Sequence, residues 1–295
     1  MPMYIMPKQQ ILFVINPVSG SGKSFDWKSL ISDNLDSTRF NYNIRFTQAQ
    51  GDAIIFTREA VGRGIDIICA VGGDGTINEV AQGLINTSSA LAIIPRGSGN
   101  GLARHFKIPT DPAKAIKKLS ASQLHSIDTG LLNEKLFLCV AGLGFDATVA
   151  KAFDQFGKRG LLTYAWLSIR NFFTYRAENY TITLDQKKII TQAFLIAFAN
   201  ASQFGNNAYI APTASTDDGL LNLVIIKPFP IWSIFGLISK VFNKKIHLSK
   251  YCDSYLFQSL KIESPNSIAH IDGEPVDSGQ QVQVSVRPNS LNILY

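Results

Sequence analysis

The chain has 295 residues, 46% of them hydrophobic and 17% charged, which is typical of a globular protein with one large domain or, more readily, two. Its formal net charge of +6 suits anionic partners such as a nucleotide, nucleic acid or a membrane face, without distinguishing among them. Three cysteines without a C-x-x-C pair indicate buried packing residues in a reducing compartment, and the spacing of the four histidines argues against zinc.

Short apolar runs alternate with helical patterns up to about residue 126. Strands are predicted at 11–15, 42–46, 65–71 and 91–94, and helices near 25–35, 52–63 and 76–86. This alternation predicts an α/β domain with a parallel sheet and helices on both faces. Ligands of such sheets gather at the carboxyl ends of the strands, so the segments that follow the strands are expected to meet in one crevice.

The first of these segments, Asn16-Pro17-Val18-Ser19-Gly20, offers an amide, a hydroxyl and backbone donors to a phosphate or a ribose. A capped turn that leads into the next helix is the alternative. Proline at position 17 excludes the Walker pattern, which needs glycine there. Lys23 is either a phosphate contact or a solvated lysine.

The segment after the third predicted strand, Gly72-Gly73-Asp74-Gly75-Thr76, has the layout of a phosphate-binding turn. Glycines let backbone N–H groups approach phosphate closely, and the following helix presents its positive end. Thr76 and Glu79 have the S/T-x-x-E spacing of a capping box, which predicts that the helix begins here. Asp74 would be repelled by a phosphate unless it held Mg²⁺ or accepted a proton, although a turn aspartate bonded to its own backbone is the alternative.

Two further motifs complete the set. The fourth predicted strand is followed by a glycine-dense loop with two arginines, Pro95-Arg96-Gly97-Ser98-Gly99-Asn100-Gly101-Leu102-Ala103-Arg104. Near the C-terminus, Asp272 and Glu274 flank Gly273, and an extended segment would place both carboxylates on one face. The competing interpretation is a hairpin turn with exposed carboxylates, because Asp-Gly is a strong hairpin signal.

After Asp128 the pattern changes to short alternating runs that predict an antiparallel, β-sandwich-like domain. We expect strands at 136–140, 180–184, 188–198, 220–226, 259–262, 282–286 and 290–294, with helical segments at 151–176 and 228–247. The predicted domains are residues 1–127 and 128–295, and a return of the last residues to the first domain is left open.

The motifs N-P-x-S-G, G-G-D-G-T-x-N-E, P-x-G-S-x-N and D-G-E, in this order, resemble those of the lipid kinase family that joins soluble bacterial diacylglycerol kinases with sphingosine and ceramide kinases. The resemblance spans nearly the whole chain. It implies two domains with ATP in the cleft between them, and transfer of phosphate from ATP to a lipid hydroxyl with Mg²⁺ as cofactor. The positions that match nucleotide contacts are Asn16, Pro17, Val18, Ser19, Gly20, Thr47, Gly73, Asp74, Gly75, Thr76, Ile77, Asn78, Glu79 and Ser98. For Thr47, closure of a strand by a β-branched residue is the alternative.

The resemblance also implies the catalytic residues. Glu274 matches the acceptor of the hydroxyl proton, with Asp272 and Asp74 as the other catalytic candidates. An accessory Mg²⁺ site matches Asp218 with main-chain carbonyls of Ser215 and Leu220, a donor set that Mg²⁺ accepts. An Asp-Gly turn between strands is the alternative at this position.

The resemblance implies diacylglycerol as the acceptor of the phosphate, and its phosphorylation would give phosphatidic acid. However, Ser98 and Gly101 depart from the bacterial diacylglycerol kinase pattern P-x-G-T-x-N-D and match the sphingosine kinase pattern, so a sphingoid base or another lipid alcohol stays open. An NAD kinase, which also carries G-G-D-G, and a lipid- or nucleotide-binding regulator without turnover are the remaining alternatives.

The sequence predicts a peripheral membrane contact on the cytoplasmic face. Residues 227–250 carry five lysines and no acid, and Ile231, Phe235, Ile238 and Phe242 recur at helical spacing, which fits a basic amphipathic helix on anionic lipid. The alternative is that this stripe covers the β domain. The stretch 151–176, with Lys158, Arg159 and Trp166, is similar. We expect no signal peptide, no membrane span and no nucleic-acid partner, whereas a homodimer is left open.

Overall fold

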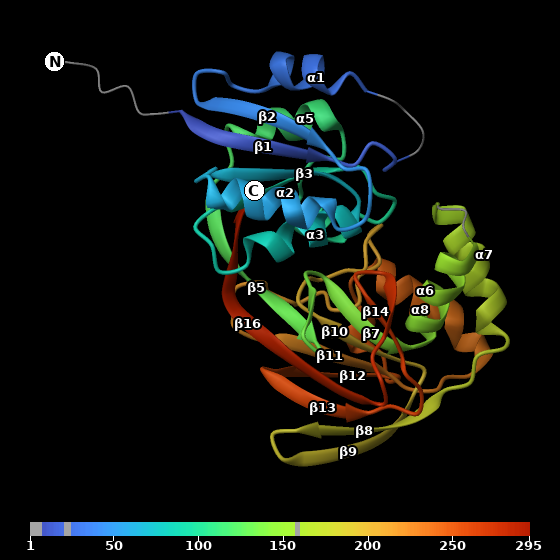
Figure 1. The fold of residues 1–295 in the computed structure, drawn as a ribbon. Coiled ribbons are helices and arrows are strands. Elements are labelled where there is room, and N and C mark those ends of the chain that lie inside the picture. Colours follow the sequence, from blue (N-terminus) through green and yellow to red (C-terminus); the bar gives the residue numbers. More distant parts are fainter. Residues whose placement is uncertain (1–7, 21–24, 157–159) are drawn as a thin grey trace. The chain divides into compact units, whose positions relative to one another are not determined.

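The computed structural model describes residues 8–20, 25–156 and 160–295 of the chain (Figure 1). The chain divides into two compact units, which we describe separately. Unit 1 contains Met1–Ile127 and Ser290–Tyr295, and unit 2 contains Asp128–Asn289. Two strands pass from one unit into the other, β5 (Leu124–Leu132) and β16 (Gln281–Leu294).

Unit 1 is a parallel sheet in the order β2-β1-β3-β4-β16, with only the end of β16 taking part. Its other strands are β1 (Gln9–Ile15), β2 (Phe40–Phe46), β3 (Ile67–Gly72) and β4 (Ala90–Pro95). Every residue of β3 and β4 is buried, as expected of parallel strands with both faces covered. The sheet carries a topological switch point, because the chain leaves β1 toward β2 on one side and returns to β3 on the other.

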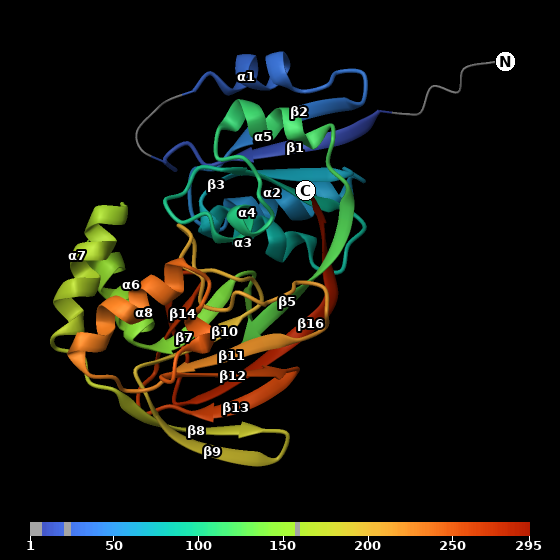
Figure 2. The same ribbon diagram turned by 180° about the vertical axis from the view of Figure 1, so that it is seen from behind.

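Helices cover both faces of this sheet. Helix α1 (Trp27–Asn34) packs on α5 (Pro112–Leu119), and α2 (Asp52–Gly62) packs on α3 (Asp74–Leu84), with the two pairs on opposite faces (Figures 1 and 2). The short α4 (Gly101–His105) follows β4. The α/β class predicted for this part of the chain is confirmed.

Unit 2 is built from antiparallel strands. One sheet has six strands in the order β12-β11-β10-β7-β14-β15, and the other strands of the unit pair as β16-β13-β8-β9 and β5-β6. The bounds are β6 (Lys135–Phe137), β7 (Val140–Gly144), β8 (Glu178–Leu184), β9 (Lys187–Ala193), β10 (Leu195–Ala199), β11 (Leu221–Ile226), β12 (Cys252–Phe257), β13 (Ser259–Glu263), β14 (Ile268–Ile271) and β15 (Glu274–Asp277). A buried cluster that includes Phe137, Tyr180 and Phe198 fills its core. The β-sandwich-like class predicted for the second part is confirmed.

Helices accompany the strands of unit 2. They are α6 (Phe145–Phe156), α7 (Leu161–Phe172) and α8 (Ile234–Phe242), with 3-10 turns η1 (Ile231–Ser233) and η2 (Ile246–Leu248) beside α8. Some predicted boundaries were wrong. The run 188–198 is two strands, β9 and β10, because the chain bends at Phe194 and passes from the sheet in which β9 pairs with β8 to the sheet in which β10 pairs with β7 and β11. The runs 282–286 and 290–294 form the single strand β16.

Candidate functional site

Three loops of unit 1 meet at the carboxyl ends of β1, β3 and β4. Backbone N–H of Asn16 donates to the carbonyl of Val71 at 2.9 Å, and the Asn16 amide donates to Thr76 Oγ1 at 3.2 Å. Backbone N–H of Arg96 donates to the carbonyl of Gly72 at 2.7 Å. The Asn16, Asp74 and Ser98 loops therefore lie side by side, and the first two flank the switch point between β1 and β3.

Asp74 binds the loop that contains Ser98. Its Oδ2 accepts from the backbone N–H of Asn100 and its Oδ1 from that of Gly101, both at 2.9 Å. The partners expected for the Asp74 carboxylate from the sequence were Mg²⁺, a proton or its own backbone. The structure gives it two N–H groups of a different loop, at the start of α4, and its role toward Mg²⁺ or a proton stays a prediction.

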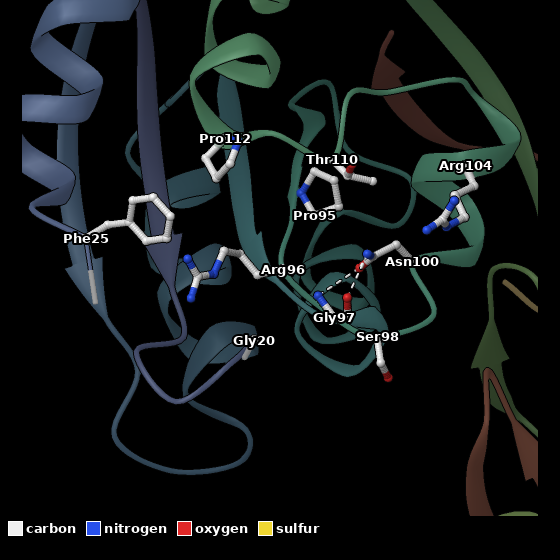
Figure 3. A pocket seen from close by; sticks show the side chains of 10 residues that line it. All are labelled: Gly20, Phe25, Pro95, Arg96, Gly97, Ser98, Asn100, Arg104, Thr110 and Pro112. Carbon is white, nitrogen blue, oxygen red and sulfur yellow. Dashed lines mark hydrogen bonds between the residues drawn. The ribbon is translucent and has the colours of Figure 1, made fainter. Parts of the chain in front are cut away.

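Glycines allow the second and third loops to touch. A Cβ atom on Gly97 would lie 2.8 Å from Gly73 Cα and 2.9 Å from Asn100 Oδ1, closer than real Cβ contacts. The side chain of Asn100, which has a left-handed backbone conformation, closes the turn by accepting from Gly97 N–H at 2.8 Å and donating to its carbonyl at 2.7 Å (Figure 3). Glycine at these positions thus serves contact between loops as well as any approach of phosphate.

We expect Gly97→Ala to destabilise unit 1 by about 1–3 kcal/mol, because the added methyl group meets backbone that cannot move aside. The measurement is urea unfolding of the variant against the wild type. Gly62→Ala is the matched control, since a Cβ there meets no described atom within 4 Å. Equal stability of Gly97→Ala and the control would show that the loops do not pack as described.

Other predicted contacts of unit 1 have partners within the fold. Backbone N–H of Thr47 donates to the carbonyl of Ile15 at 2.9 Å, so Thr47 lies beside the end of β1. Ile77 and Asn78 are buried in α3, whereas Pro17 and Val18 are exposed. Lys23 lies outside the described residues.

The predicted capping box is wrong. Helix α3 begins at Asp74 after Gly73, and Thr76 is already in its first turn. The Glu79 carboxylate instead accepts from Gly51 N–H at 3.0 Å and Ala53 N–H at 3.2 Å, at the start of α2. Glu79 therefore caps a neighbouring helix, a contact that sequence spacing does not reveal.

A pocket of about 270 Å³ opens beside these loops within unit 1 (Figure 3). Its lining combines glycine and proline backbone with polar and aromatic side chains, from Gly20, Phe25, Pro95, Arg96, Gly97, Ser98, Asn100, Arg104, Thr110 and Pro112. No role was predicted from the sequence for Arg96, Arg104, Phe25 or Thr110. The pair of arginines in a glycine-rich loop was the available signal.

Arg96 is held firmly at this pocket. One guanidinium nitrogen donates to the carbonyl of Ser19 at 3.0 Å, and the guanidinium carbon lies 4.5 Å from the centre of the Phe25 ring. Burial lowers the pKa of Arg96, yet a guanidinium stays protonated at neutral pH. The pocket therefore presents a fixed positive charge beside the first and third loops.

In unit 2, Asp272 and Gly273 form the two-residue turn of the β14–β15 hairpin. Both have positive φ, 50° and 87°, and Ile271 pairs with Glu274 across the turn. The hairpin turn of the alternative interpretation is present, but only Glu274 is exposed, whereas Asp272 is half-buried; the extended conformation that would place both carboxylates on one face is not observed.

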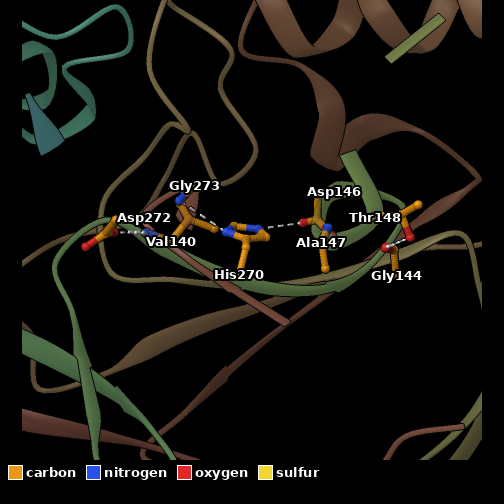
Figure 4. Close-up of polar contacts among 8 residues, drawn as sticks. All are labelled: Val140, Gly144, Asp146, Ala147, Thr148, His270, Asp272 and Gly273. Carbon is orange, nitrogen blue, oxygen red and sulfur yellow. Dashed lines mark hydrogen bonds and ion pairs between the residues drawn. The ribbon is translucent and has the colours of Figure 1, made fainter. Parts of the chain in front are cut away.

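The Asp272 carboxylate anchors this hairpin. It accepts from the backbone N–H groups of Leu138 at 2.9 Å and Cys139 at 2.8 Å. It also accepts from the backbone N–H of Val140 at 3.1 Å, the contact that Figure 4 shows. Glu274 follows as the exposed first residue of β15. These contacts hold the turn in place, and Glu274 is the carboxylate at the surface, whereas the catalytic role of Asp272 stays a prediction.

The segment around Ser215, Asp218 and Leu220 is a turn. Asp218 Oδ1 accepts from Leu220 N–H at 2.9 Å, and Ser215 donates to Asp217. Asp128, fully buried, accepts from Gly219 N–H at 2.7 Å and from Asn289 N–H at 2.8 Å. Within the described part of the chain, no group of three or more His, Cys, Asp and Glu residues could hold a metal ion.

Exposed apolar side chains gather on α7, η1 and α8, and α7 and α8 lie near each other in both views (Figures 1 and 2). Trp232 is 79% and Phe235 81% exposed, and Ile231, Ile238 and Phe242 are exposed as well. The predicted stripe therefore faces outward, and the interpretation that it covers the β domain is wrong; Leu237 is the residue of α8 that is buried. Residues 158 and 159 lie outside the described part. No described helix is long and apolar enough to cross a bilayer.

Family comparisons cover nearly all of the chain. The diacylglycerol kinase catalytic domain matches residues 10–132, and the YegS C-terminal NAD kinase beta sandwich-like domain matches residues 139–295. A Pseudomonas aeruginosa protein named "Probable lipid kinase YegS-like" is 29% identical over 98% of this chain and 95% of its own length. A protein of the same name from Chromohalobacter salexigens is 32% identical, over 63% of this chain and 62% of its own length.

Solved structures agree with the fold. A crystal structure described as a diacylglycerol kinase from Bacillus anthracis has a TM-score of 0.76 and 22% identity, and the match covers 97% of each chain. The second family model alone spans more than half of this chain, and both models match in the order that the motifs indicate. The chain therefore belongs to the lipid kinase family whose members combine a diacylglycerol kinase catalytic domain with a YegS C-terminal domain.

Proposed function

We propose that this protein transfers the γ-phosphate of ATP to the hydroxyl of diacylglycerol, giving phosphatidic acid, in a Mg²⁺-dependent reaction. The observation that carries the proposal is the meeting of the Asn16, Asp74 and Ser98 loops at the switch point of the sheet in unit 1. Doubly wound sheets bind nucleotides at this point. Residues 10–132, which contain these three loops, match the diacylglycerol kinase catalytic domain.

The nucleotide in this proposal binds the three loops. Helix α3 has eleven residues and begins at Gly73-Asp74, so its first backbone N–H groups point toward the switch point and favour phosphate. Asn16, Ser19, Gly20, Gly75 and Thr47 are further proposed contacts of the nucleotide at the same edge. Arg96 and Arg104 add charge from the pocket, whose volume suits part of a nucleotide.

The Mg²⁺ of a kinase binds one or two carboxylates together with phosphate oxygens and waters, and Asp74 supplies such a carboxylate. A carboxylate has about four acceptor positions, so contacts with two N–H groups are compatible with a metal or a metal-bound water. The ion neutralises phosphate charge when it is bound.

Glu274 is the proposed general base. Its carboxylate takes the proton of the lipid hydroxyl while the hydroxyl oxygen bonds to the γ-phosphorus, and the bond from that phosphorus to the bridging oxygen breaks, releasing ADP. Its exposed position at the start of β15 supports this role, as does the anchored turn that precedes it. Positioning and electrostatics supply most of the rate in such transfers.

A second Mg²⁺ is proposed at Asp218, with the carbonyls of Ser215 and Leu220. Because a cation that binds only the folded state stabilises it, Mg²⁺ alone should raise the melting temperature of the wild type more than that of Asp218→Ala. Asp154→Ala, at an exposed carboxylate of α6 in the same unit, is the control. An identical response of wild type and Asp218→Ala would leave this segment as a turn without a metal.

Contact with the cytoplasmic membrane face is proposed for α7, α8 and the segment that joins α8 to β12. Exposed aromatic residues here stand beside Arg170, Lys240, Lys244 and Lys245, the combination that binds anionic lipid surfaces. We expect the double variant Trp232→Ala/Phe235→Ala to lose at least about 10-fold in binding to phosphatidylglycerol vesicles, since each aromatic ring contributes on the order of 2 kcal/mol when buried. Vesicle sedimentation measures this loss of binding.

The control is Ile190→Ala, which removes an apolar side chain that is 79% exposed on β9 of the same unit. It should bind vesicles like the wild type. Raised salt should weaken wild-type binding, because lysines act on the surface only within a Debye length of about 8–10 Å. Unchanged vesicle binding by the double variant would remove α8 from the proposed membrane contact.

The acceptor is tested by a panel assay with γ-labelled ATP, Mg²⁺ and separate preparations of diacylglycerol, sphingosine and NAD. Diacylglycerol is expected to receive the label. Label on sphingosine would support the relation of Ser98 and Gly101 to the sphingosine kinase pattern. The reaction would still be phosphorylation of a lipid hydroxyl, but sphingosine would replace diacylglycerol as the acceptor. Label on NAD would refute lipid phosphorylation.

A further inference from the structure

A histidine and an aspartate are paired in the interior of unit 2, behind the β14–β15 hairpin (Figure 4). His270 on β14 is 2% exposed and Asp146, in the first turn of α6, is 7% exposed. His270 Nε2 lies 3.0 Å from Asp146 Oδ2, and Asp146 Oδ1 accepts from Ala147 N–H at 2.9 Å. Burial of these polar groups costs free energy unless they are hydrogen-bonded, and these contacts supply the hydrogen bonds.

The strand beside them leaves room for the pair. His270 is opposite Gly142 of β7, and a Cβ atom on Gly142 would lie 2.4 Å from Asp146 Oδ2 and 2.7 Å from His270 Nε2. Any larger residue at position 142 would thus displace the pair. The pair depends on β7, β14 and α6 together, which makes it a specific feature of this fold rather than a surface contact.

The other ring nitrogen of His270 contacts the turn. Backbone N–H of Gly273 donates to His270 Nδ1 at 3.3 Å. A nitrogen that accepts carries no proton, so the neutral ring has its proton on Nε2 and donates it to Asp146. The hydrogen bonds run from Gly273 through the imidazole to Asp146 in one direction.

We propose that His270, oriented by Asp146, is a positioning residue that fixes the Gly273 main chain and thereby the Glu274 carboxylate. Each residue of the turn then has its own anchor: Asp272 is bound to residues 138–140, and Gly273 is bound to His270. The consequence for activity rests on the proposed role of Glu274. Loss of the Gly273 contact should lower kcat and leave the KM for ATP unchanged, because the loops that would bind the nucleotide are in unit 1.

Two substitutions separate the two ring nitrogens. The amide of His270→Asn occupies the position of Nδ1 and keeps an acceptor for Gly273, whereas the amide of His270→Gln occupies the position of Nε2 and keeps a donor for Asp146. We expect His270→Gln to lower kcat about 10- to 100-fold, since displacement by 1 Å costs about 100-fold. His270→Asn should lower it much less, and both should keep the KM for ATP within about twofold.

Tyr180→Phe is the matched control for stability. Tyr180, on β8, is also buried in unit 2 and donates to Glu178 at 3.0 Å, without a contact to the Asp272–Gly273 turn among those described. The Tyr180→Phe substitution should lower the melting temperature of the protein without changing kcat. A wild-type kcat for His270→Gln, or equal losses for the Asn and Gln variants, would overturn the inference.

Two measurements do not need lipid turnover. Nitrogen-15 NMR of the wild-type imidazole should show His270 protonated on Nε2 and not on Nδ1, and the opposite tautomer would contradict the geometry even if every variant failed to fold. Hydrogen exchange at Gly273 should be faster in His270→Gln than in His270→Asn. If the wild type phosphorylated no lipid, the proposed function would fail, while these two measurements would still decide whether His270 holds the turn.

Discussion

Replacing Glu274 by glutamine is expected to reduce lipid phosphorylation by at least about 100-fold, the usual contribution of a general base. Glutamine has nearly the same size and keeps the β15 strand, but it cannot accept the hydroxyl proton. Steady-state kinetics with varied ATP should show the loss in kcat with the KM for ATP preserved.

Asp277→Asn is the control for this variant, because Asp277 is an exposed carboxylate at the other end of β15. It should keep wild-type kcat. A Glu274→Gln enzyme with normal turnover and weakened ATP binding would move Glu274 from the acceptor side of the reaction to the nucleotide.

Asp74→Asn is expected to have a loss of similar size, at least about 100-fold in turnover, for two reasons that act together. The amide lacks the charge proposed for Mg²⁺, and, because Asn100 and Gly101 donate to different oxygens of Asp74, one of these two N–H groups would face the NH2 group of the asparagine. Leaving one buried N–H group without an acceptor costs about 1–3 kcal/mol, so the melting temperature should fall as well. Kinetics and thermal unfolding of the same preparation measure both effects.

Asp36→Asn serves as the comparison. The Thr38 hydroxyl and backbone N–H donate to Asp36 in the turn between α1 and β2, and they hold the pKa of that carboxyl below its usual value. This variant loses the same kind of contact outside the three loops and should keep full activity. Full activity in Asp74→Asn would mean that neither its charge nor its contact with the Ser98 loop matters for transfer.

The fold could be predicted where apolar patterns are strong. The buried runs of β1, β3 and β4 have glycine, proline or asparagine at their ends, so both their existence and their approximate bounds follow from the sequence. Strand β12 was missed, because Cys252 to Leu256 are at least partly exposed and lack a continuous apolar run. Strand β16 was divided in two because Pro288 lies within it, yet the strand continues past this residue.

The site could be predicted only as far as local motifs reach. The glycine loops and their meeting point follow from the strand ends, because parallel strands share an edge. The partners of Asp74, Glu79 and Asp272 are 26, 28 and 134 residues away in the chain, so no spacing rule identifies them. Asp146 and His270 are likewise 124 residues apart, and each alone resembles an ordinary buried polar residue.

Transfer of the γ-phosphate of ATP to a lipid hydroxyl is tested best by following the labelled phosphate. Purified protein, γ-³²P-labelled ATP and Mg²⁺ are incubated with phosphatidylglycerol vesicles that contain diacylglycerol, and the lipid and aqueous phases are separated. We predict that the label enters the lipid phase as phosphatidic acid, and that chelation of Mg²⁺ or the Glu274→Gln substitution prevents this. If the label stayed in the aqueous phase with every lipid alcohol supplied, or were transferred to NAD, this protein would not be a kinase of these lipids.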